Sequence, residues 1–344
     1  MDSSSHHFCN PLRCAVLGAG AWGTAMAIHL ASLEHAVFLI PRDVFHAQRM
    51  LNSGGNDEFI PGISFPKNLR VTEDFSAIRH CDFIFLGCPS AGVVEFCQRI
   101  QRVSWDPLKR RPLIISLCKG FIPETCHLPL QVIGEILPHF SCGVLSGPTY
   151  AMDVALGKLT AAVFASRGPL DVLLCVQKIL SSNSFRVYIS EDAAGVELGG
   201  CLKNPYAIGI GLAIAAECGD NGCAALIARM VAEMARIGVA LGGNRDTFYG
   251  LSGLGDFLAT ANGRWSRNRM FGERVGRGER PEVVAQSQRS VVEGYHSINC
   301  FYKLCRQMGL QTPILDEIYG IIYQGKSYAA AMQKLMNRNL KWED

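Results

Sequence analysis

The glycine-rich segment Gly18-Ala19-Gly20-Ala21-Trp22-Gly23 constrains the fold more than any other feature of the sequence. It follows an apolar run, Arg13–Gly18, that predicts a buried strand, and it leads into TAMAIHLA, which is typical of a helix. In this strand–turn–helix setting the glycines of a GxGxxG pattern allow a tight turn, close approach of a ligand to the backbone, and packing of helix on strand. We therefore expect Gly18, Gly20, Ala21, Trp22 and Gly23 to bind a dinucleotide at a helix N-terminus. A glycine-rich turn without a ligand is the alternative interpretation.

Short apolar runs alternate with helix-length segments through the first half of the chain. The runs that predict strands are Arg13–Gly18, Ala36–Ile40, Phe83–Gly87, Leu113–Leu117, Gly143–Leu145, Ala161–Ala165 and Arg186–Ile189. The first five are almost continuously apolar, as expected for strands buried on both faces of a parallel sheet.

After about Ser190 these runs end, and apolar residues recur at helical spacing, as in Ala224–Leu241 and Val292–Met308. The sequence thus predicts an α/β domain with a mostly parallel sheet over residues 12–190. An all-helical domain over 191–344 should follow it, and residues 1–11 should form a disordered lead-in.

Composition excludes several classes of partner. The 344 residues are enough for two domains, and 49% hydrophobic with 18% charged residues is an ordinary globular composition. A net charge of +3, spread along the chain, argues against binding to nucleic acid or to an anionic membrane. The apolar stretch Pro205–Ala216 is too short to span a bilayer.

Cysteine usage points to a reducing compartment. None of the 14 cysteines has CxxC spacing, and several, such as Cys88, Cys118 and Cys175, lie inside apolar runs where they act as small hydrophobic residues. The N-terminus also lacks a signal-peptide pattern. We therefore expect a cytoplasmic protein, and because no His and Cys cluster has ligand spacing, we expect no metal.

The end of the second predicted strand bears on the choice of dinucleotide. It reads Ile40-Pro41-Arg42-Asp43. Arg42 could stack on an adenine or pair with the 2′-phosphate of NADP, whereas Asp43 could bind the ribose of NAD. A solvated surface pair is the other interpretation of these two residues. The sequence therefore leaves both NAD and NADP as expected cofactors.

Several further segments occur in one characteristic order. They are VLGAGAWGTAMA (16–27), Pro89-Ser90, Lys119-Gly120, SGPTYA (146–151), GVELGGCLKN (195–204), GLGD (253–256), WSRNRMFG (265–272) and VVEG (291–294). With these motifs the chain resembles the soluble, bacterial-type NAD(P)-dependent glycerol-3-phosphate dehydrogenases over roughly residues 13–325.

The resemblance implies a Rossmann-like domain followed by an all-helical domain, with the site in the cleft between them. It also implies NAD(P)H-linked interconversion of dihydroxyacetone phosphate and sn-glycerol 3-phosphate, which supplies phospholipid synthesis. The partner would be a small phosphorylated substrate, and the expected assembly is a homodimer.

By resemblance, Lys203 is the proton acceptor and donor, Lys119 contacts both substrate and cofactor, and Asp256 binds substrate and pairs with Lys203. Lys203 lies in an apolar, glycine-rich run where an ammonium is costly to bury, and a lysine that exchanges a proton suits general acid–base catalysis. Lys119 follows a strand at the edge where ligands of parallel sheets bind, and its charge would stabilise an alkoxide. Taken alone, Lys203 and Lys119 could be surface lysines, and Asp256 could be a helix N-cap.

The run Ser266-Arg267-Asn268 offers a hydroxyl, a guanidinium and an amide to a phosphate group, although a basic surface turn is the alternative. The resemblance also assigns Gly147 and Thr149 to the substrate. It assigns Ala151, Val291 and Glu293, with Arg267 and Lys119, to the cofactor.

Three departures from the family pattern and two alternative functions remain. Pro205 directly follows Lys203-Asn204 and should kink the helix or remove a backbone bond. The segment before Ser266 reads ANGRW and not the usual shorter polar or acidic stretch, and the LIPRD segment lacks the Trp common at that strand's end. Arginines near Ser266 would also bind a carboxylate, so a related β-hydroxyacid-type dehydrogenase is one alternative. A redox sensor that binds NAD(P)H without turnover is the other.

Overall fold

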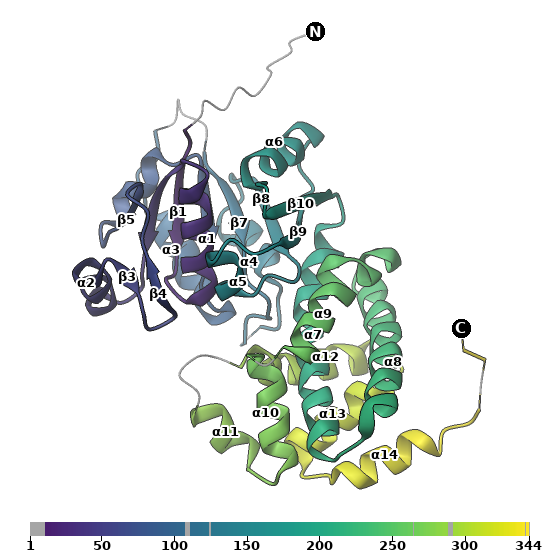
Figure 1. The fold of residues 1–344 in the computed structure, drawn as a ribbon. Helices are drawn as coiled ribbons and strands as arrows, with labels where there is room; N and C mark the ends of the chain where they lie inside the picture. The colour runs from purple at the N-terminus through teal and green to yellow at the C-terminus, as the bar shows by residue number, and fades with distance from the viewer. Residues whose placement is uncertain are drawn as a thin grey trace. The chain divides into compact units, whose positions relative to one another are not determined.

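Two units divide the chain, Met1–Glu197 and Leu198–Asp344. The structure is a computed structural model that describes residues 11–106, 111–123, 125–263, 265–287, 292–340 and 342–343. Figure 1 shows a sheet flanked by helices in the first unit and only helices in the described part of the second. This confirms the predicted fold class, an α/β domain followed by a helical region.

The first unit is organised around a sheet of eight described strands in the order β10-β9-β8-β7-β6-β1-β2-β5. Their bounds are β1 (Arg13–Leu17), β2 (Ala36–Ile40), β5 (Leu69–Val71), β6 (Phe83–Leu86), β7 (Leu113–Ser116), β8 (Cys142–Ser146), β9 (Thr160–Ala165) and β10 (Phe185–Ser190). Among the described pairs of this sheet, only β8 and β9 run antiparallel. The chain leaves β1 towards β2 on one side and later returns to β6 on the other, so the strand order reverses at β1, where open parallel sheets bind ligands.

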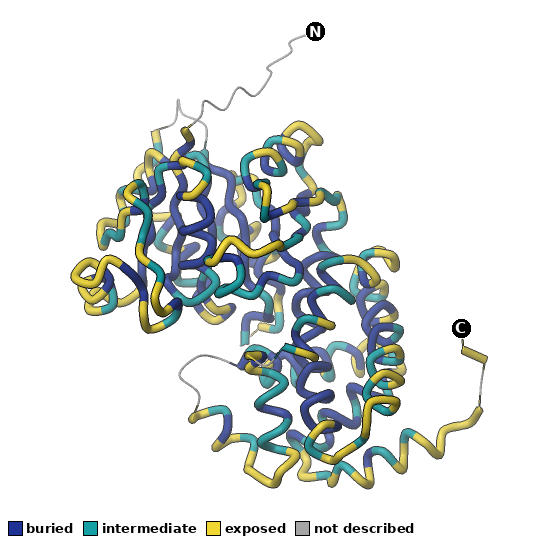
Figure 2. The backbone as a smooth tube through the Cα atoms, in the orientation of Figure 1, coloured by how far each residue is buried: buried dark blue, intermediate teal, exposed yellow. Residues whose placement is uncertain are grey.

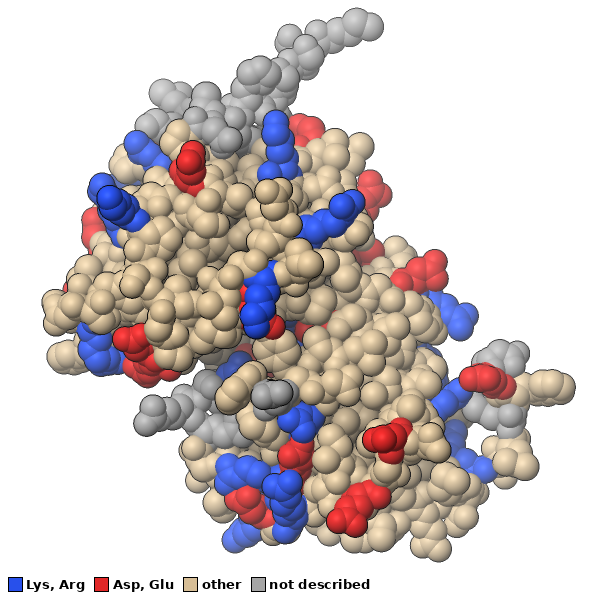
Figure 3. Space-filling view, viewed as in Figure 1, with Lys and Arg blue, Asp and Glu red and all other residues tan. Residues whose placement is uncertain are grey.

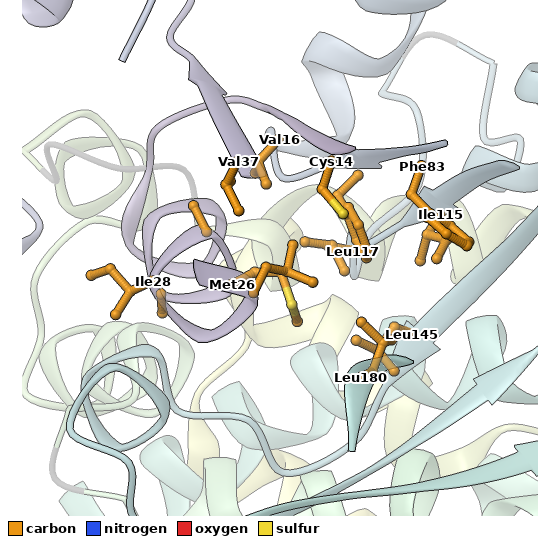
Figure 4. Close-up of a cluster of buried hydrophobic side chains, with 14 of the residues drawn as sticks. Cys14, Val16, Met26, Ile28, Val37, Phe83, Ile115, Leu117, Leu145 and Leu180 are labelled. Carbon is orange, nitrogen blue, oxygen red and sulfur yellow. The ribbon is translucent and has the colours of Figure 1, made fainter. Parts of the chain in front are cut away.

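Both faces of the central strands are buried, and alternate residues supply the two cores. Cys14 and Val16 of β1 face one core, while Ala15 and Leu17 face the other. Figure 4 shows the first core, where Met26 of α1 (Ala21–Ser32) faces strand side chains, and Leu180 of α6 (Leu170–Leu180) belongs to the same core. The second core is covered by α3 (Val93–Gln101) and α4 (Pro129–Ile136).

Each of the seven predicted strands is present within a residue or two of its expected bounds, whereas three short strands were missed. These are β5 and the antiparallel pair β3 (Gly55–Asn56) and β4 (Ile60–Ser64), which follows α2 (Val44–Ser53). The segment that holds β3 and β4, GNDEFIPGIS, is polar and contains proline and glycine, so it carries no strand periodicity, and β5 is only three residues long. Three short helical segments complete the first unit, namely η1 (Phe75–His80), η2 (Ser90–Gly92) and α5 (Ala151–Ala155).

Helix α7 (Ala193–Ala215) begins in the first unit and continues into the second. It is buried from Gly195 to Ala213, and Figure 2 shows it in dark blue. Near its start, Glu197 accepts a hydrogen bond from the backbone N–H of Leu130 at 2.9 Å, and burial raises the pKa of Glu197 to about 8. Pro205 lies inside α7, which continues to Ala215 although residue 205 has no N–H to donate.

The second unit contains helices alone in its described part. After α7 come α8 (Gly219–Ala240), η3 (Arg245–Tyr249), the π-helical turn η4 (Leu251–Gly255), α9 (Asp256–Asn262), α10 (Arg267–Gly276), α11 (Pro281–Ser287), α12 (Glu293–Gln307), α13 (Pro313–Gln324) and α14 (Tyr328–Met336). None of the described helices combines the length and apolar character that a membrane crossing requires. On the face drawn in Figure 3, basic and acidic side chains are intermixed.

Candidate active site

The glycine-rich loop joins three backbone segments at van der Waals distance. A Cβ on Gly18, whose φ is +104°, would lie 2.8 Å from the backbone N of Cys88, and one on Gly23 would lie 2.1 Å from the carbonyl O of Gly18. A Cβ on Gly87, at the end of β6, would lie 2.7 Å from the Cα of Gly23. Gly87 was not predicted as part of the loop's packing, although it ends the predicted strand Phe83–Gly87. Any side chain at these three positions would separate α1 from β1 and β6.

Gly20 is different, because a Cβ on it would meet no described atom within 4 Å. It is the N-cap of α1, and no side chain caps the first turn, which starts with Ala21 and Trp22. The Trp22 ring packs against the core, and its Nε1 has no hydrogen-bond partner among the described residues. An open glycine at an uncapped helix N-terminus fits a dinucleotide pyrophosphate, which needs backbone N–H donors and close approach.

Arg42 and Asp43 lie just beyond β2. The Arg42 guanidinium pairs with Glu95 at 3.1 Å, and both side chains are exposed. Because exposed pairs contribute less than about 1 kcal/mol, little free energy holds Arg42 in this position. Asp43 is the N-cap of α2, where its carboxylate accepts a hydrogen bond from the Phe45 N–H, so the structure gives it a structural role.

Lys119, Gly147 and Thr149 come together at the carboxyl edge of the sheet, after β7 and β8. The Lys119 Nζ donates to the Gly147 carbonyl at 2.8 Å and to the Thr149 Oγ1 at 3.1 Å. The Thr149 hydroxyl also donates to the Gly147 carbonyl at 3.1 Å. Gly147 has φ +135°, a conformation that favours glycine. Ala151 follows as the first residue of α5.

In the second unit the structure pairs Lys203 with Asp256. Lys203 is 7% exposed, and its Nζ donates to the Asp256 Oδ1 at 2.6 Å and to the Thr260 Oγ1 at 2.8 Å. Asp256 is the first residue of α9, whose N-cap is Gly255, so the alternative N-cap role does not hold. Buried ions of opposite charge at this distance stabilise each other only when their remaining hydrogen bonds are also satisfied.

Thr260 was not anticipated from the sequence. It lies one helical turn after Asp256, and its hydroxyl donates to the Asp256 carbonyl at 2.7 Å while it accepts from Lys203. The i, i+4 spacing of Asp256 and Thr260 on a helix was the available signal. The π-helical turn η4 directly precedes Asp256, and such turns are frequent at functional sites.

A second polar connection links Asn204, Asn268 and the start of α12. The Asn268 Nδ2 donates to the Asn204 Oδ1 at 2.8 Å, and the Asn268 Oδ1 accepts from the Gly294 N–H at 3.0 Å. A Cβ on Gly294 would lie 2.7 Å from both the Asn204 carbonyl and the Asn268 Oδ1, so glycine is needed there. Glu293, beside it, is the first residue of α12, and Val291 lies outside the described residues.

The Ser266-Arg267-Asn268 run lies at the start of α10. Ser266 is its N-cap and accepts from the Arg269 N–H at 3.2 Å, and Arg267 is its first residue. Helices α7 and α10 touch through their backbones, because a Cβ on Gly211 would lie 2.1 Å from the Arg269 carbonyl. This close packing holds the run beside the helix that carries Lys203 and Asn204. Among the described residues, no group of His, Cys, Asp and Glu could hold a metal ion.

A parallel sheet whose strand order reverses at a glycine-rich helix start places the first unit among the Rossmann-type dinucleotide-binding proteins. The sequence also matches two family profiles, NAD-dependent glycerol-3-phosphate dehydrogenase N-terminus over residues 13–169 and the C-terminus of the same family over residues 192–333. The chain belongs to the NAD-dependent glycerol-3-phosphate dehydrogenase family. The resemblance inferred from the motifs is thus confirmed.

Similar proteins cover nearly the full length. A glycerol-3-phosphate dehydrogenase [NAD(P)+] of Thiobacillus denitrificans is 39% identical, over 96% of this chain and all of its own length. One of Desulfitobacterium hafniense is 37% identical over 96% of this chain and 93% of its own. Among solved structures, glycerol-3-phosphate dehydrogenase from Coxiella burnetii has a TM-score of 0.88 and 30% identity, over 95% of this chain and 99% of that one.

Proposed function

We propose that this chain catalyses the NAD(P)H-linked interconversion of dihydroxyacetone phosphate and sn-glycerol 3-phosphate. The observation that carries the proposal is the buried Lys203–Asp256 pair, in a chain that matches the family over both units. A buried lysine held by a carboxylate and a hydroxyl is fixed in direction, so its ammonium can donate a proton and its amine form can take one back. The product would supply phospholipid synthesis.

The predicted dinucleotide-binding domain, residues 12–190, would bind NAD or NADP through Gly18, Gly20, Ala21, Trp22, Gly23, Arg42 and Ala151. When bound, the nicotinamide supplies or accepts the hydride at C2 of the substrate. Lys119, held by Gly147 and Thr149, would place its positive charge at the C2 oxygen and stabilise the alkoxide. Gly147 and Thr149 would contact the same substrate.

The predicted helical domain, residues 191–344, would supply the proton and bind the phosphate. Lys203 would donate a proton to the C2 oxygen or remove it, with Asp256 holding the ammonium in direction. Ser266, Arg267 and Asn268, at the start of α10, would bind the phosphate. Arg267, Val291 and Glu293 would also contact the cofactor.

Initial rates test this function. Dihydroxyacetone phosphate should be reduced with NADH, NADPH or both, and 2-keto and 3-keto acids should not. Turnover of a keto acid without turnover of dihydroxyacetone phosphate would favour the β-hydroxyacid-type alternative. Binding of NADH or NADPH without any oxidation in the presence of triose phosphate would favour the sensor.

A cytoplasmic location and a homodimeric assembly belong to the same proposal. Eleven of the described cysteines are free thiols, and most of them are buried, whereas Cys126 and Cys300 are disulfide-bonded, so cysteine pairing does not by itself support the expected reducing compartment. Cell fractionation tests the location, and sedimentation equilibrium at micromolar concentration tests the assembly. A secreted protein or a monomer would contradict the respective part.

A further inference from the structure

Asn56 contacts the dinucleotide loop from outside the GxGxxG motif. It lies in β3, after α2, and is 2% exposed. Its Nδ2 donates to the Ala19 carbonyl at 2.9 Å and to the Thr24 Oγ1 at 2.7 Å. Both acceptors belong to the segment that starts α1, and Thr24 is itself fully buried.

The hydrogen-bonding groups of the Asn56 side chain are all used. Its amide has two N–H donors, one for Ala19 and one for Thr24, so its Oδ1 must accept from the His46 Nε2, which lies 3.0 Å away. The His46 ring packs beside Phe59, with ring centroids 5.5 Å apart. A buried amide with satisfied donors and acceptor has one favoured orientation, because any rotation would leave polar groups unpaired.

The bond to Ala19 has a geometric consequence for the loop. The Ala19 carbonyl and the Gly20 N–H belong to one planar trans peptide, so they point in opposite directions. Fixing the carbonyl therefore also fixes the direction of the Gly20 N–H. Gly20 has no side chain, and a Cβ there would touch no described atom, so packing at Gly20 does not set this orientation.

We propose that Asn56 is a positioning residue for dinucleotide binding, which sets the Ala19–Gly20 peptide so that its N–H faces the pyrophosphate before binding. The inference rests on the proposed function of the loop. Asn56 acts through Ala19 and not on the reacting atoms. Without its bond, the peptide samples several orientations, and binding must restrict it at a cost in free energy.

The chain offers a matched control at the other end of the same helix. Asn68 donates through Nδ2 to the Ala31 carbonyl at 2.8 Å and to the His35 carbonyl at 2.6 Å. It thus makes two similar bonds at the C-terminal end of α1, one to its last turn and one to the residues that follow, at the opposite end of the helix from the loop. Asn56→Ala and Asn68→Ala each remove two amide donors that hold α1, but only the first removes one from the loop.

The experiment compares the affinity for NADH and NADPH, measured by fluorescence titration, with the thermal unfolding midpoint of the full-length variants. Asn56→Ala should raise the Kd for the dinucleotide and its KM about 10-fold or more, with kcat and the KM for dihydroxyacetone phosphate within about 3-fold. Asn68→Ala should lower the midpoint but leave the Kd within about 2-fold. Asn56→Asp is the second variant, for use if the alanine variant does not fold. It keeps the side-chain shape and removes the amide donors, so it should weaken dinucleotide binding at least as much.

Two results would overturn the inference while leaving the function standing. One is an Asn56→Ala or Asn56→Asp enzyme that binds the dinucleotide as tightly as the unmodified enzyme. The other is an equal loss of affinity in Asn68→Ala, which would reduce the role of Asn56 to general stability. An unmodified protein that binds neither NADH nor NADPH would overturn the proposed function together with the inference.

Discussion

The two units build their functional groups in opposite ways. In the first, the loop after β1 depends on missing side chains, since Gly18, Gly23 and Gly87 bring three backbone segments into contact. In the second, the polar groups are side chains that reach across helices, as Lys203 does to Asp256 and Thr260. Where backbone segments are in contact, an added side chain has no room and disturbs the packing. Where a charged side chain is buried, removing its partner leaves an unpaired charge.

This difference also determines how each site fails. Adding a methyl group in the glycine loop should disturb packing first and binding as a result. Removing the Lys203 ammonium in the helical unit should disturb the chemistry while the dinucleotide still binds. The variants below test that separation, from the largest expected effect to the smallest.

Lys203→Ala should lower kcat by about 10³-fold or more, because it removes the proposed proton donor and acceptor. Affinity for the dinucleotide should stay within about 2-fold, since the loop lies in the other unit. Stopped-flow turnover and NADH titration measure the two effects. Retained kcat would remove Lys203 from the mechanism and weaken the contrast between the units.

Lys326→Ala is the matched control for that variant. Lys326 also pairs with a buried carboxylate of the helical unit, that of Glu317, which keeps a second partner in Lys334. Its loss should lower stability and leave kcat within about 2-fold. A comparable drop in kcat would mean that any disrupted lysine in this unit impairs turnover.

Arg267→Ala should raise the KM for dihydroxyacetone phosphate by roughly 30- to 1000-fold, equivalent to about 2–4 kcal/mol for a desolvated guanidinium. With unphosphorylated dihydroxyacetone as substrate, the KM of Arg267→Ala and that of the unmodified enzyme should be almost equal in steady-state kinetics. Arg269→Ala, which removes a neighbouring arginine paired with Glu273, is the control and should change the KM by less than about 3-fold. Equal losses with both substrates would contradict the phosphate role.

Gly23→Ala should destabilise the protein by about 2–3 kcal/mol, because the new Cβ would lie 2.1 Å from the Gly18 carbonyl. Gly20→Ala places its Cβ in open space and should leave stability unchanged within about 0.5 kcal/mol, yet it should weaken dinucleotide binding. Urea unfolding and NADH titration of both variants make the comparison. If both lost stability equally, the assignment of Gly20 to ligand approach would be wrong.

Tyr206→Phe should have the smallest effect, a loss of about 1 kcal/mol in stability with kcat unchanged. The Tyr206 hydroxyl donates to Glu233 at 3.0 Å, and Glu233 also accepts from the backbone N–H groups of Ile314 and Leu315 at the start of α13. Burial raises the pKa of Glu233, and burial together with Glu233 raises that of Tyr206. Urea unfolding measures the loss of stability. A large fall in kcat would mean that Tyr206 also supports the active site.

The sequence predicted the sheet and the loop well for a physical reason. Strands buried on both faces must be continuously apolar, and GxGxxG is a local pattern, so both can be read without knowledge of distant contacts. The loop's support by Asn56 could not be read, because Asn56 lies in a polar segment without periodicity and meets Ala19 only through the fold.

The helical unit was harder to predict from the residues alone. Lys203 and Asp256 are 53 positions apart, and no local pattern pairs them, so their link came from family resemblance. Thr260 and Gly294 were missed for the same reason, since each matters through a neighbour from another helix or turn. Pro205 was expected to kink its helix or remove a backbone bond; α7 continues past it to Ala215, although residue 205 has no N–H to donate.

The division between the units falls inside α7, and this has a practical consequence. Proteases cut exposed, locally unfolded chain, but residues 195–213 of α7 are buried and helical. Brief digestion should therefore trim surface loops and leave the chain joined at residues 197 and 198. For the same reason, producing either half alone would sever a helix and leave its apolar side chains open to aggregation.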